Sequence, residues 1–239
     1  MRSSRLLAGA VVGVQLVYPA VPARWRVRAT QAVMGVVAAA AVQSLRERVG
    51  GRRAAAMVAC SAGVGTVAEV VGVRTGRPFG RYAYGDGLGP KVLGVPPGVP
   101  VAWTMLSPAA WSVAGLVARS PAARVATAAG ALTAWDVHLD PRMVREGHWR
   151  WPGGGAYAGV PLSNFGGWFV TGLGLFGLWA LLDGDGEPDD ADLVLYLWTW
   201  VGETVAGVRF WGAPGVAAAG FAAMGAFAVP ALRARLARG

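Results

Sequence analysis

The sequence predicts an all-α membrane protein: a polytopic helical bundle of about eight transmembrane helices in one domain, residues 1–239, with two long ordered loops on one face. Of its residues, 54% are hydrophobic and only 15% are charged, whereas a soluble domain carries about 25% charged residues. Apolar runs of near-membrane length recur along the chain. The mean hydropathy is +0.44. We therefore expect an integral, multi-pass membrane protein.

Eight apolar runs are the predicted spans, and several are rich in glycine and alanine, which let helices approach closely within lipid. They cover residues 6–22, 28–45, 54–73, 99–118, 122–139, 165–182, 192–210 and 213–232. The first run follows Arg2 and Arg5 and resembles a signal peptide. Because further spans follow it, we interpret it as an uncleaved first span.

The connections between the spans differ in character. Loops 74–98 and 140–164 are long and rich in Gly, Pro, Tyr and Trp, which is not the composition of a flexible linker. We expect both to be ordered. With eight spans they emerge on the same face. Arg and Lys divide equally between the two sides of such a bundle, so the positive-inside rule assigns no orientation.

Charge and cysteine content exclude several functions. The net charge is +9, but the arginines fall in short loops between apolar runs, as interface anchors do, so we expect no nucleic-acid partner. Cys60 is the single cysteine, so the chain forms no internal disulfide and no cysteine-based metal site. With only two histidines, no metal site is predicted.

Two carboxyl groups stand near the end of the fifth predicted span. Asp136 and Asp140 are four residues apart and share one helical face, although Pro141 predicts that the helix ends there. Two neighbouring carboxyls in a poorly solvated place do not both ionise easily, so one could keep its proton and act as an acid. Alternatively, Asp136 pairs with Arg142 or Arg145, and Asp140 caps the loop.

Two further acids lie inside apolar runs. Glu69 is in the third predicted span and Glu203 in the seventh. An ionisable group within a span is costly and usually faces a cavity or a partner. Pairing with an arginine such as Arg74 or Arg209 is the structural alternative. In a bundle of eight spans, both glutamates and both aspartates lie towards the face that carries the long loops.

Aromatic residues accompany these acids. An acid beside aromatic faces at a lipid boundary could add a proton to an isolated alkene, because aromatic rings stabilise a cation. Water would then attack the carbocation, or a proton would leave it. The alternative is an ordinary aromatic belt at the membrane interface. The residues are Trp149, Trp151, Tyr157, Phe165 and Trp168 near the aspartates, and Tyr82, Tyr84 and Trp103 in the other loop region.

A short pattern occurs twice. Gly94-Val95-Pro96 is followed by Trp103, and Gly159-Val160-Pro161 is followed at the same spacing by Trp168. Each copy follows a long loop and leads into a predicted span. The pattern indicates either an internal repeat or a coincidence in a chain rich in glycine and proline.

The long loops and their flanks resemble the membrane carotenoid hydratases of the CruF and bisanhydrobacterioruberin hydratase type, over roughly residues 65–210. The first stretch carries Glu69, Gly72, Pro78-Phe79-Gly80, Tyr82, Tyr84, Leu88-Gly89, Gly94-Val95-Pro96, Pro100 and Trp103. The second carries Asp136, Asp140-Pro141, Trp149-Arg150-Trp151, Tyr157, Gly159-Val160-Pro161, Asn164-Phe165 and Gly167-Trp168.

The resemblance implies a hydro-lyase that needs no cofactor and works in a bacterial cell membrane. Such an enzyme adds water to the terminal 1,2 double bond of an acyclic carotenoid end and gives a tertiary hydroxyl. The substrate would be a C40 end, as in lycopene or γ-carotene, or a C50 end of the bisanhydrobacterioruberin type. The expected partners are a carotenoid within the bilayer, membrane lipid, and other enzymes of the carotenoid pathway.

The candidate roles follow from this chemistry. Asp136 or Asp140 protonates the alkene, and Glu69 or Glu203 orients water or takes its proton. Asn164 holds the water or a carboxyl. The remaining candidates bind substrate: Trp149, Trp151 and Trp168 beside the cation, Tyr82 and Tyr84 at the mouth, and Tyr157 and Trp103 around them. A lycopene-type cyclase is the alternative enzyme, and a carotenoid- or lipid-binding membrane protein without activity is the other alternative.

Overall fold

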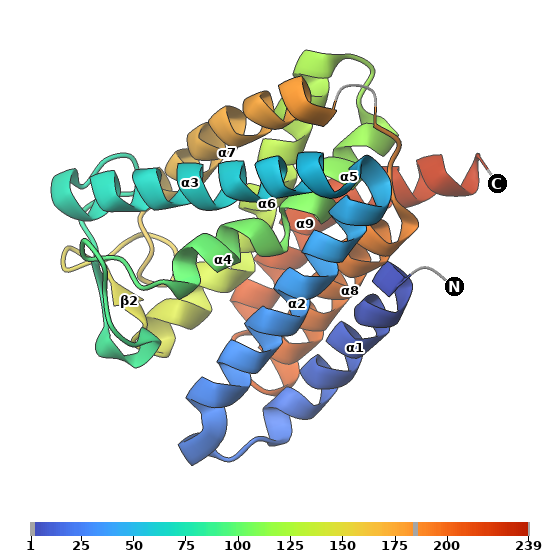
Figure 1. Cartoon of the computed structure of the whole chain (residues 1–239). Coiled ribbons are helices and arrows are strands. Elements are labelled where there is room, and N and C mark those ends of the chain that lie inside the picture. Colours follow the sequence, from blue (N-terminus) through green and yellow to red (C-terminus); the bar gives the residue numbers. More distant parts are fainter. Residues whose placement is uncertain (1–2, 184–185, 239) are drawn as a thin grey trace.

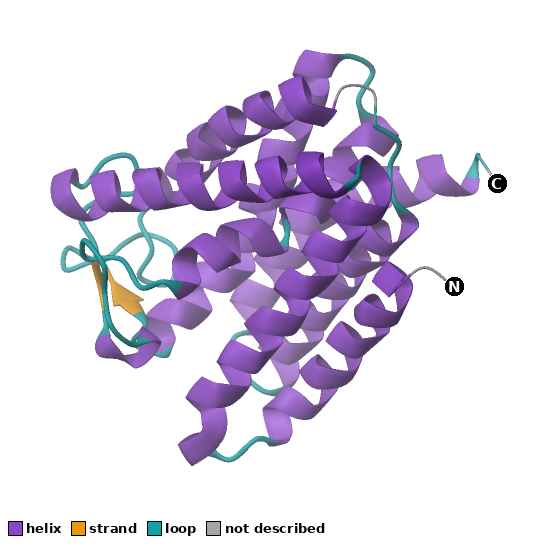
Figure 2. Ribbon diagram, viewed as in Figure 1, coloured by secondary structure: helices purple, strands orange, loops and turns teal. Residues whose placement is uncertain are grey.

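The computed structural model describes residues 3–183 and 186–238, which form an α-helical bundle with two short strands at one end (Figures 1 and 2). The helices are α1 (Ser3–Val17), α2 (Arg26–Val49), α3 (Gly51–Thr75), α4 (Gly98–Met105), α5 (Ser107–Val117), α6 (Pro121–Arg145), α7 (Leu162–Asp183), α8 (Asp190–Arg209) and α9 (Pro214–Leu236). The strands are β1 (Ala83–Tyr84) and β2 (Trp149–Arg150).

Every predicted span overlaps a helix, although the fourth is divided into α4 and α5 and the first runs past the end of α1. Fewer of the spans meet the requirements for crossing a membrane. Four segments are long and apolar enough among the described residues: α3, α4 with α5, α7 and α9. Helix α1 has only 15 residues, and α6 carries several ionisable side chains. The structure therefore supports a membrane protein with four candidate spans, and the full count of eight remains a prediction.

Helix α6 lies at the centre of the bundle and packs against α5, α7 and α9. It begins at Ser120, whose side-chain oxygen accepts a hydrogen bond from the Ala123 amide at 3.2 Å, with Pro121 in the first turn. One of its faces is almost continuously buried, from Ala128 to Asp140. The ionisable groups on that face are therefore held inside the protein rather than in lipid.

Pro141 does not end this helix, contrary to the prediction from sequence. Helix α6 continues to Arg145. A proline inside a helix leaves the carbonyl four residues earlier without its usual donor. That carbonyl belongs to Val137, and the Tyr157 hydroxyl donates to it at 3.1 Å. A side chain from the second long loop thus replaces the missing backbone hydrogen bond, as buried backbone groups require.

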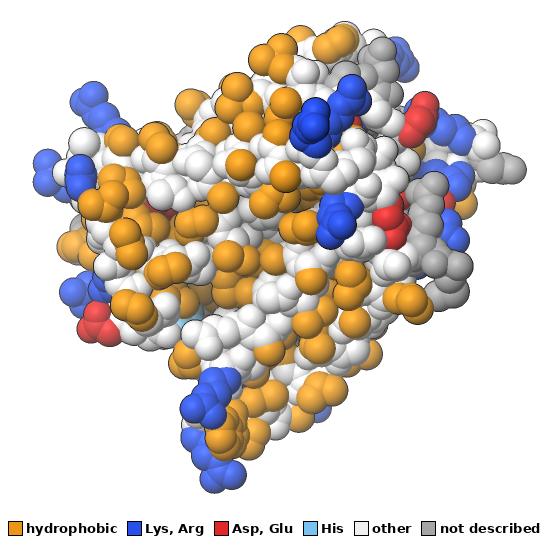
Figure 3. Space-filling model, in the orientation of Figure 1, with side chains coloured by type: hydrophobic (Ala, Val, Ile, Leu, Met, Phe, Trp, Pro, Cys, Tyr) orange, Lys and Arg blue, Asp and Glu red, His pale blue; other side chains and the backbone are white. Residues whose placement is uncertain are grey.

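The two long loops are ordered, as predicted, and the structure shows that they pack together. Strands β1 and β2 pair in antiparallel fashion, with Ala83 opposite Arg150 and Tyr84 opposite Trp149. Figure 2 shows these strands in orange at one end of the bundle. In Figure 3 the middle of the visible face is mostly white and orange, and charged side chains lie mainly towards its edges. The loops therefore form a joined cap at one end of an apolar body.

The repeated sequence pattern has a structural counterpart. Val92 bridges to Val95, and Tyr157 bridges to Val160. In both turns the two central residues have positive φ: 54° and 88° at Leu93 and Gly94, and 48° and 87° at Ala158 and Gly159. A tight turn of this kind needs positive φ at both positions, which favours glycine. The two copies thus adopt the same backbone conformation.

The two copies also meet each other at matching positions. Tyr84 and Trp149 stand at the same distance before these turns, and they are opposite each other in the strand pair. Trp103 and Trp168 stand at the same distance after them, and their rings stack. Contact between a position and its own counterpart is what a local two-fold axis produces. The structure therefore supports the internal repeat.

A buried ionic cluster closes the opposite end of the bundle. The Asp183 carboxylate is completely buried and lies 2.9 Å from Arg48 and 3.4 Å from Arg124. The Trp111 indole also donates to it. These contacts join α2, α5, α6 and α7 at a point remote from the long loops. They stabilise the end of the bundle opposite the candidate site.

Candidate functional site

A cavity of about 700 Å³ lies beneath the joined loops. Its lining includes the acids Glu69 and Asp140, the amide of Asn164 and several aromatic side chains. Helices α3, α6 and α7 supply the three polar groups, so residues distant in sequence meet at one place. Glu69 and Asp140 are 5% and 2% exposed, which means that the cavity holds them away from bulk water.

Asp136 and Asp140 form a bridged pair. They lie one turn apart on α6, and the Asn164 side-chain amide donates to Asp136 Oδ2 at 2.9 Å and also to Asp140 Oδ2. Asp140 lines the cavity, and Asp136, which is 0% exposed, lies behind it. A single neutral amide between two buried carboxyls cannot compensate two negative charges, so this arrangement favours a shared proton.

The alternative arginine partners of this pair are engaged elsewhere. Arg142 pairs with Glu203 at 3.3 Å and lies 3.8 Å from Glu146. Arg145 donates to the backbone carbonyl of Trp211. Within the parts of the chain that the structure describes, neither aspartate has an ion pair. The alternative in which Asp136 pairs with Arg142 or Arg145 is therefore not found in the structure.

Glu69 has a different environment, because three donors converge on its carboxylate. The hydroxyls of Tyr82 and Tyr84 donate to Oε2, the latter at 2.6 Å, and Trp103 Nε1 donates to Oε1 at 3.3 Å. Gly72 allows the close approach, since a Cβ there would lie 2.8 Å from the Tyr82 hydroxyl oxygen. Donors of this kind favour the ionised form of a carboxylate, whereas the burial of Glu69 opposes ionisation.

The two tyrosines remain protonated donors. Burial raises the pKa of both Tyr82 and Tyr84 above the usual value, and the nearby Glu69 carboxylate raises it further. The tyrosinate forms would place a second negative charge against Glu69, which the buried site disfavours. In this structure they fix Glu69 and line the cavity, and their place at its mouth stays a prediction.

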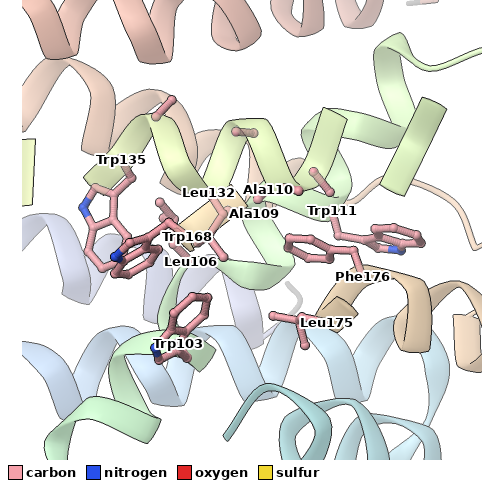
Figure 4. Close-up of a cluster of buried hydrophobic side chains, with 14 of the residues drawn as sticks. Trp103, Leu106, Ala109, Ala110, Trp111, Leu132, Trp135, Trp168, Leu175 and Phe176 are labelled. Carbon is pink, nitrogen blue, oxygen red and sulfur yellow. The ribbon is translucent and has the colours of Figure 1, made fainter. Parts of the chain in front are cut away.

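Aromatic rings form the walls beside the acids. Trp103 and Trp168 stack with ring centroids 4.3 Å apart, and Trp135 meets Trp168 edge-on at 6.3 Å. Figure 4 shows these three indoles together, at one end of a cluster of apolar side chains. On the loop side, Trp151 lies against Tyr82 and Trp149 against Tyr84. All four predicted tryptophans thus line the cavity.

Two predicted residues stand apart from this cluster. Tyr157 packs on Phe165 and bonds the Val137 carbonyl. Burial and the nearby Asp136 raise the pKa of Tyr157 to about 12. Glu203 lines another part of the cavity, where its carboxylate pairs with Arg142. Tyr157 therefore supports the α6 backbone, and Glu203 neutralises a cation. Neither residue is hydrogen-bonded to Asp136, Asn164 or Asp140.

Some cavity residues were not identified from the sequence. Trp135 and Phe79 line the cavity, and the Phe79 carbonyl accepts a hydrogen bond from Trp151 Nε1 at 3.0 Å. Trp135 directly precedes Asp136, and that adjacency was the available signal. In the described ranges no group of three His, Cys, Asp or Glu side chains is placed to hold a metal ion.

The comparisons with known proteins agree with the resemblance noted in the sequence. A family model described as "carotenoid biosynthesis protein" matches residues 28–224, a range that contains every residue of the site. No curated protein and no solved structure matches the chain.

Proposed function

Since the chain belongs to the family of carotenoid biosynthesis proteins, we propose that it is a carotenoid 1,2-hydratase that acts on an acyclic carotenoid end. One observation carries this proposal. A buried pair of carboxyls, bridged by one amide, presents Asp140 to a cavity walled by indole rings. Such a site suits the protonation of an isolated alkene, followed by capture of the carbocation.

The first step is proton transfer from Asp140 to the terminal double bond. The alkene's electron pair forms a C–H bond at carbon 2, which leaves a tertiary carbocation at carbon 1 and a carboxylate on Asp140. Asp136 and Asn164 position Asp140, since the amide bonds both carboxyls. General acid catalysis of this kind contributes roughly 10²–10⁴-fold to a rate.

The aromatic wall then stabilises the cation. Trp168 is stacked on Trp103 and flanked by Trp135, so the orientation of its ring is fixed before substrate binds. A cation over an indole face gains about 2 kcal/mol when it is desolvated. Glu69 accepts three hydrogen bonds on the same cavity, and its carboxylate form adds an attractive negative charge there. The wall and the carboxylate together lower the cost of forming charge away from water.

Water capture completes the reaction. The oxygen of a water molecule bonds to carbon 1, and Glu69 accepts the proton released from that water. Glu69 suits this role better than Glu203, because Glu203 is neutralised by Arg142 at 3.3 Å. Transfer of the proton back to the aspartate pair through solvent restores the starting state. The net change is the addition of one water molecule, without a cofactor.

Expression in a host that accumulates lycopene tests the proposal. We expect the pigment to gain the mass of one water per reacted end and to become more polar. Asp140→Asn should yield unchanged lycopene, while the protein still inserts into the membrane. A cyclised pigment of unchanged mass would indicate a cyclase instead. Unchanged lycopene from the wild-type protein, despite normal insertion, would indicate a binding protein.

A further inference from the structure

The cavity extends well beyond the acids, along a path that the proposed reaction does not itself require. Besides Asp140 and Trp103, its lining includes the buried residues Leu106 and Val37 and exposed residues on α2 and α8. Figure 1 shows α2 and α4 in front of α6 and α8, and all four helices contribute to the lining. We call this extension the polyene groove; it is lined by Val27, Thr30, Met34, Val37, Met105, Leu106, Trp198, Val201, Gly202 and Val205.

The groove follows one face of each of two helices. On α2 the lining residues Val27, Thr30, Met34 and Val37 recur at helical spacing. From Val27 to Val37 there are ten residue steps, or about 15 Å of helix. On α8 the residues from Trp198 to Val205 form the facing wall. The groove therefore runs between faces of two helices.

The polar groups in its walls are already satisfied by one another. The Tyr18 hydroxyl bonds the Thr30 hydroxyl at 2.8 Å, and Trp198 Nε1 donates to Gln15 Oε1 at 2.5 Å. The Arg142 guanidinium is paired with Glu203. Most of the remaining lining on α2 and α8 is hydrocarbon, with Gln31 as a further polar side chain. A ligand there needs shape and apolar surface, and it needs few hydrogen-bonding groups.

The outer end of the groove opens on apolar surface. Val27 is 47% exposed, Val201 46% and Phe210 51%. In a membrane protein such side chains face lipid, so a ligand could pass from the bilayer into the groove without crossing water. At the inner end, Val37 is 7% exposed and Leu106 is 3% exposed. The path thus leads from the lipid side directly to the acids.

Resting on the proposed function, we propose that the polyene groove between α2 and α8 holds the conjugated chain of the substrate, and that it supplies the affinity for a long linear hydrocarbon. The terminal alkene lies at Asp140, and the chain extends past Val37 to the exposed rim at Val27 and Val205. The site therefore selects a ligand by the length of its apolar chain, and the acids act only on its end.

Bulky substitutions on the two walls test this proposal. Met34→Trp narrows the groove from α2, and Val201→Trp narrows it from α8. The matched controls are Ala39→Trp and Val208→Trp, which lie on the same helices at exposed positions outside the cavity lining. Each variant is combined with Asp140→Asn, so that lycopene bound to the purified protein is measured by absorbance without turnover.

We expect the amount of lycopene bound by each groove variant to be at least about tenfold lower than that bound by its control. A tenfold change corresponds to about 1.4 kcal/mol of binding free energy. Without Asp140→Asn, each groove variant should still hydrate a short acyclic isoprenoid with the same terminal alkene. Equal lycopene retention by groove and control variants would overturn the proposal. If the wild-type protein binds lycopene through the groove but never converts it, the proposed function fails and the groove stands.

Discussion

Trp103 and Trp168 stack with an interplanar angle of 16° and a centroid separation of 4.3 Å. They occupy equivalent positions in the two copies of the repeated pattern. Each lies in the helix that follows one of the long loops. Trp103 also donates to Glu69, and Trp168 lines the same cavity as Asp140. The stack therefore joins the two copies of the pattern, and it fixes two indole rings in the wall of the cavity that holds the proposed acid and the proposed base.

Loss of the Trp168 ring should reduce turnover more than it reduces insertion. We expect Trp168→Leu to lower hydration of lycopene by up to about thirtyfold, because a desolvated cation–π contact is worth about 2 kcal/mol. Trp168→Phe keeps an aromatic face and should lose less. Pigment analysis at equal protein levels measures both. Trp200→Leu is the control, since Trp200 stacks on Phe221 outside the cavity; equal losses in Trp200→Leu would contradict a role at the cation.

The proton donor is tested by an isosteric change. Asp140→Asn should reduce hydration at least about 100-fold, since an amide cannot donate the proton that general acid catalysis requires. The exposed Asp86, whose partner is Lys91 at 2.9 Å, provides the control Asp86→Asn. Retained turnover in Asp140→Asn, together with loss in Asp136→Asn, would transfer the donor role to Asp136.

Glu69→Gln should separate protonation from water capture. Without a base for the attacking water, the carbocation returns to alkene by losing a proton to Asp140. In deuterated water, recovered lycopene should therefore carry deuterium at its ends, while hydration falls at least about 100-fold. Mass spectrometry of the recovered pigment measures both outcomes. Unlabelled lycopene would show that Glu69 is needed before the cation forms.

The Tyr157 hydroxyl should matter for stability rather than for chemistry. Tyr157→Phe leaves the Val137 carbonyl without its donor, which should cost about 1–2 kcal/mol of the free energy of unfolding. The pKa of Tyr157 is raised to about 12, above the usual value of about 10. Its contribution is complete below pH 10 and is lost as the pH rises through 12. Thermal unfolding at several pH values should show this alkaline loss in the wild type and not in Tyr157→Phe.

The Arg142–Glu203 pair provides a test of whether Glu203 is structural. Glu203→Gln leaves the Arg142 charge without this partner, and we expect a loss of about 2–4 kcal/mol in the free energy of unfolding. The double variant Arg142→Met with Glu203→Leu should recover most of that stability, because both charges are removed together. Hydration by the stable double variant would support a structural role. Loss of hydration at restored stability would make Glu203 part of the reaction.

The sequence located the helices well, because an apolar run has to satisfy its backbone within itself when it lies in lipid. It also identified the acids that lie inside apolar runs, since such groups are costly without a purpose. It misplaced the end of α6, where Pro141 was expected to stop the helix. The compensating donor is Tyr157, which lies in a different segment, and local sequence rules do not include donors from elsewhere in the fold.

The sequence by itself determined that the chain is an apolar helical protein with carboxyl groups and aromatic rings concentrated beside two long loops. Only the tertiary structure decided which groups meet. It placed Asn164 between Asp136 and Asp140, directed Tyr82 and Tyr84 to Glu69, and engaged Arg142 with Glu203. These pairings depend on how helices rotate and cross, and packing between distant segments sets that rotation. Periodicity along the chain reports which face of a helix is apolar, but not which partner it meets.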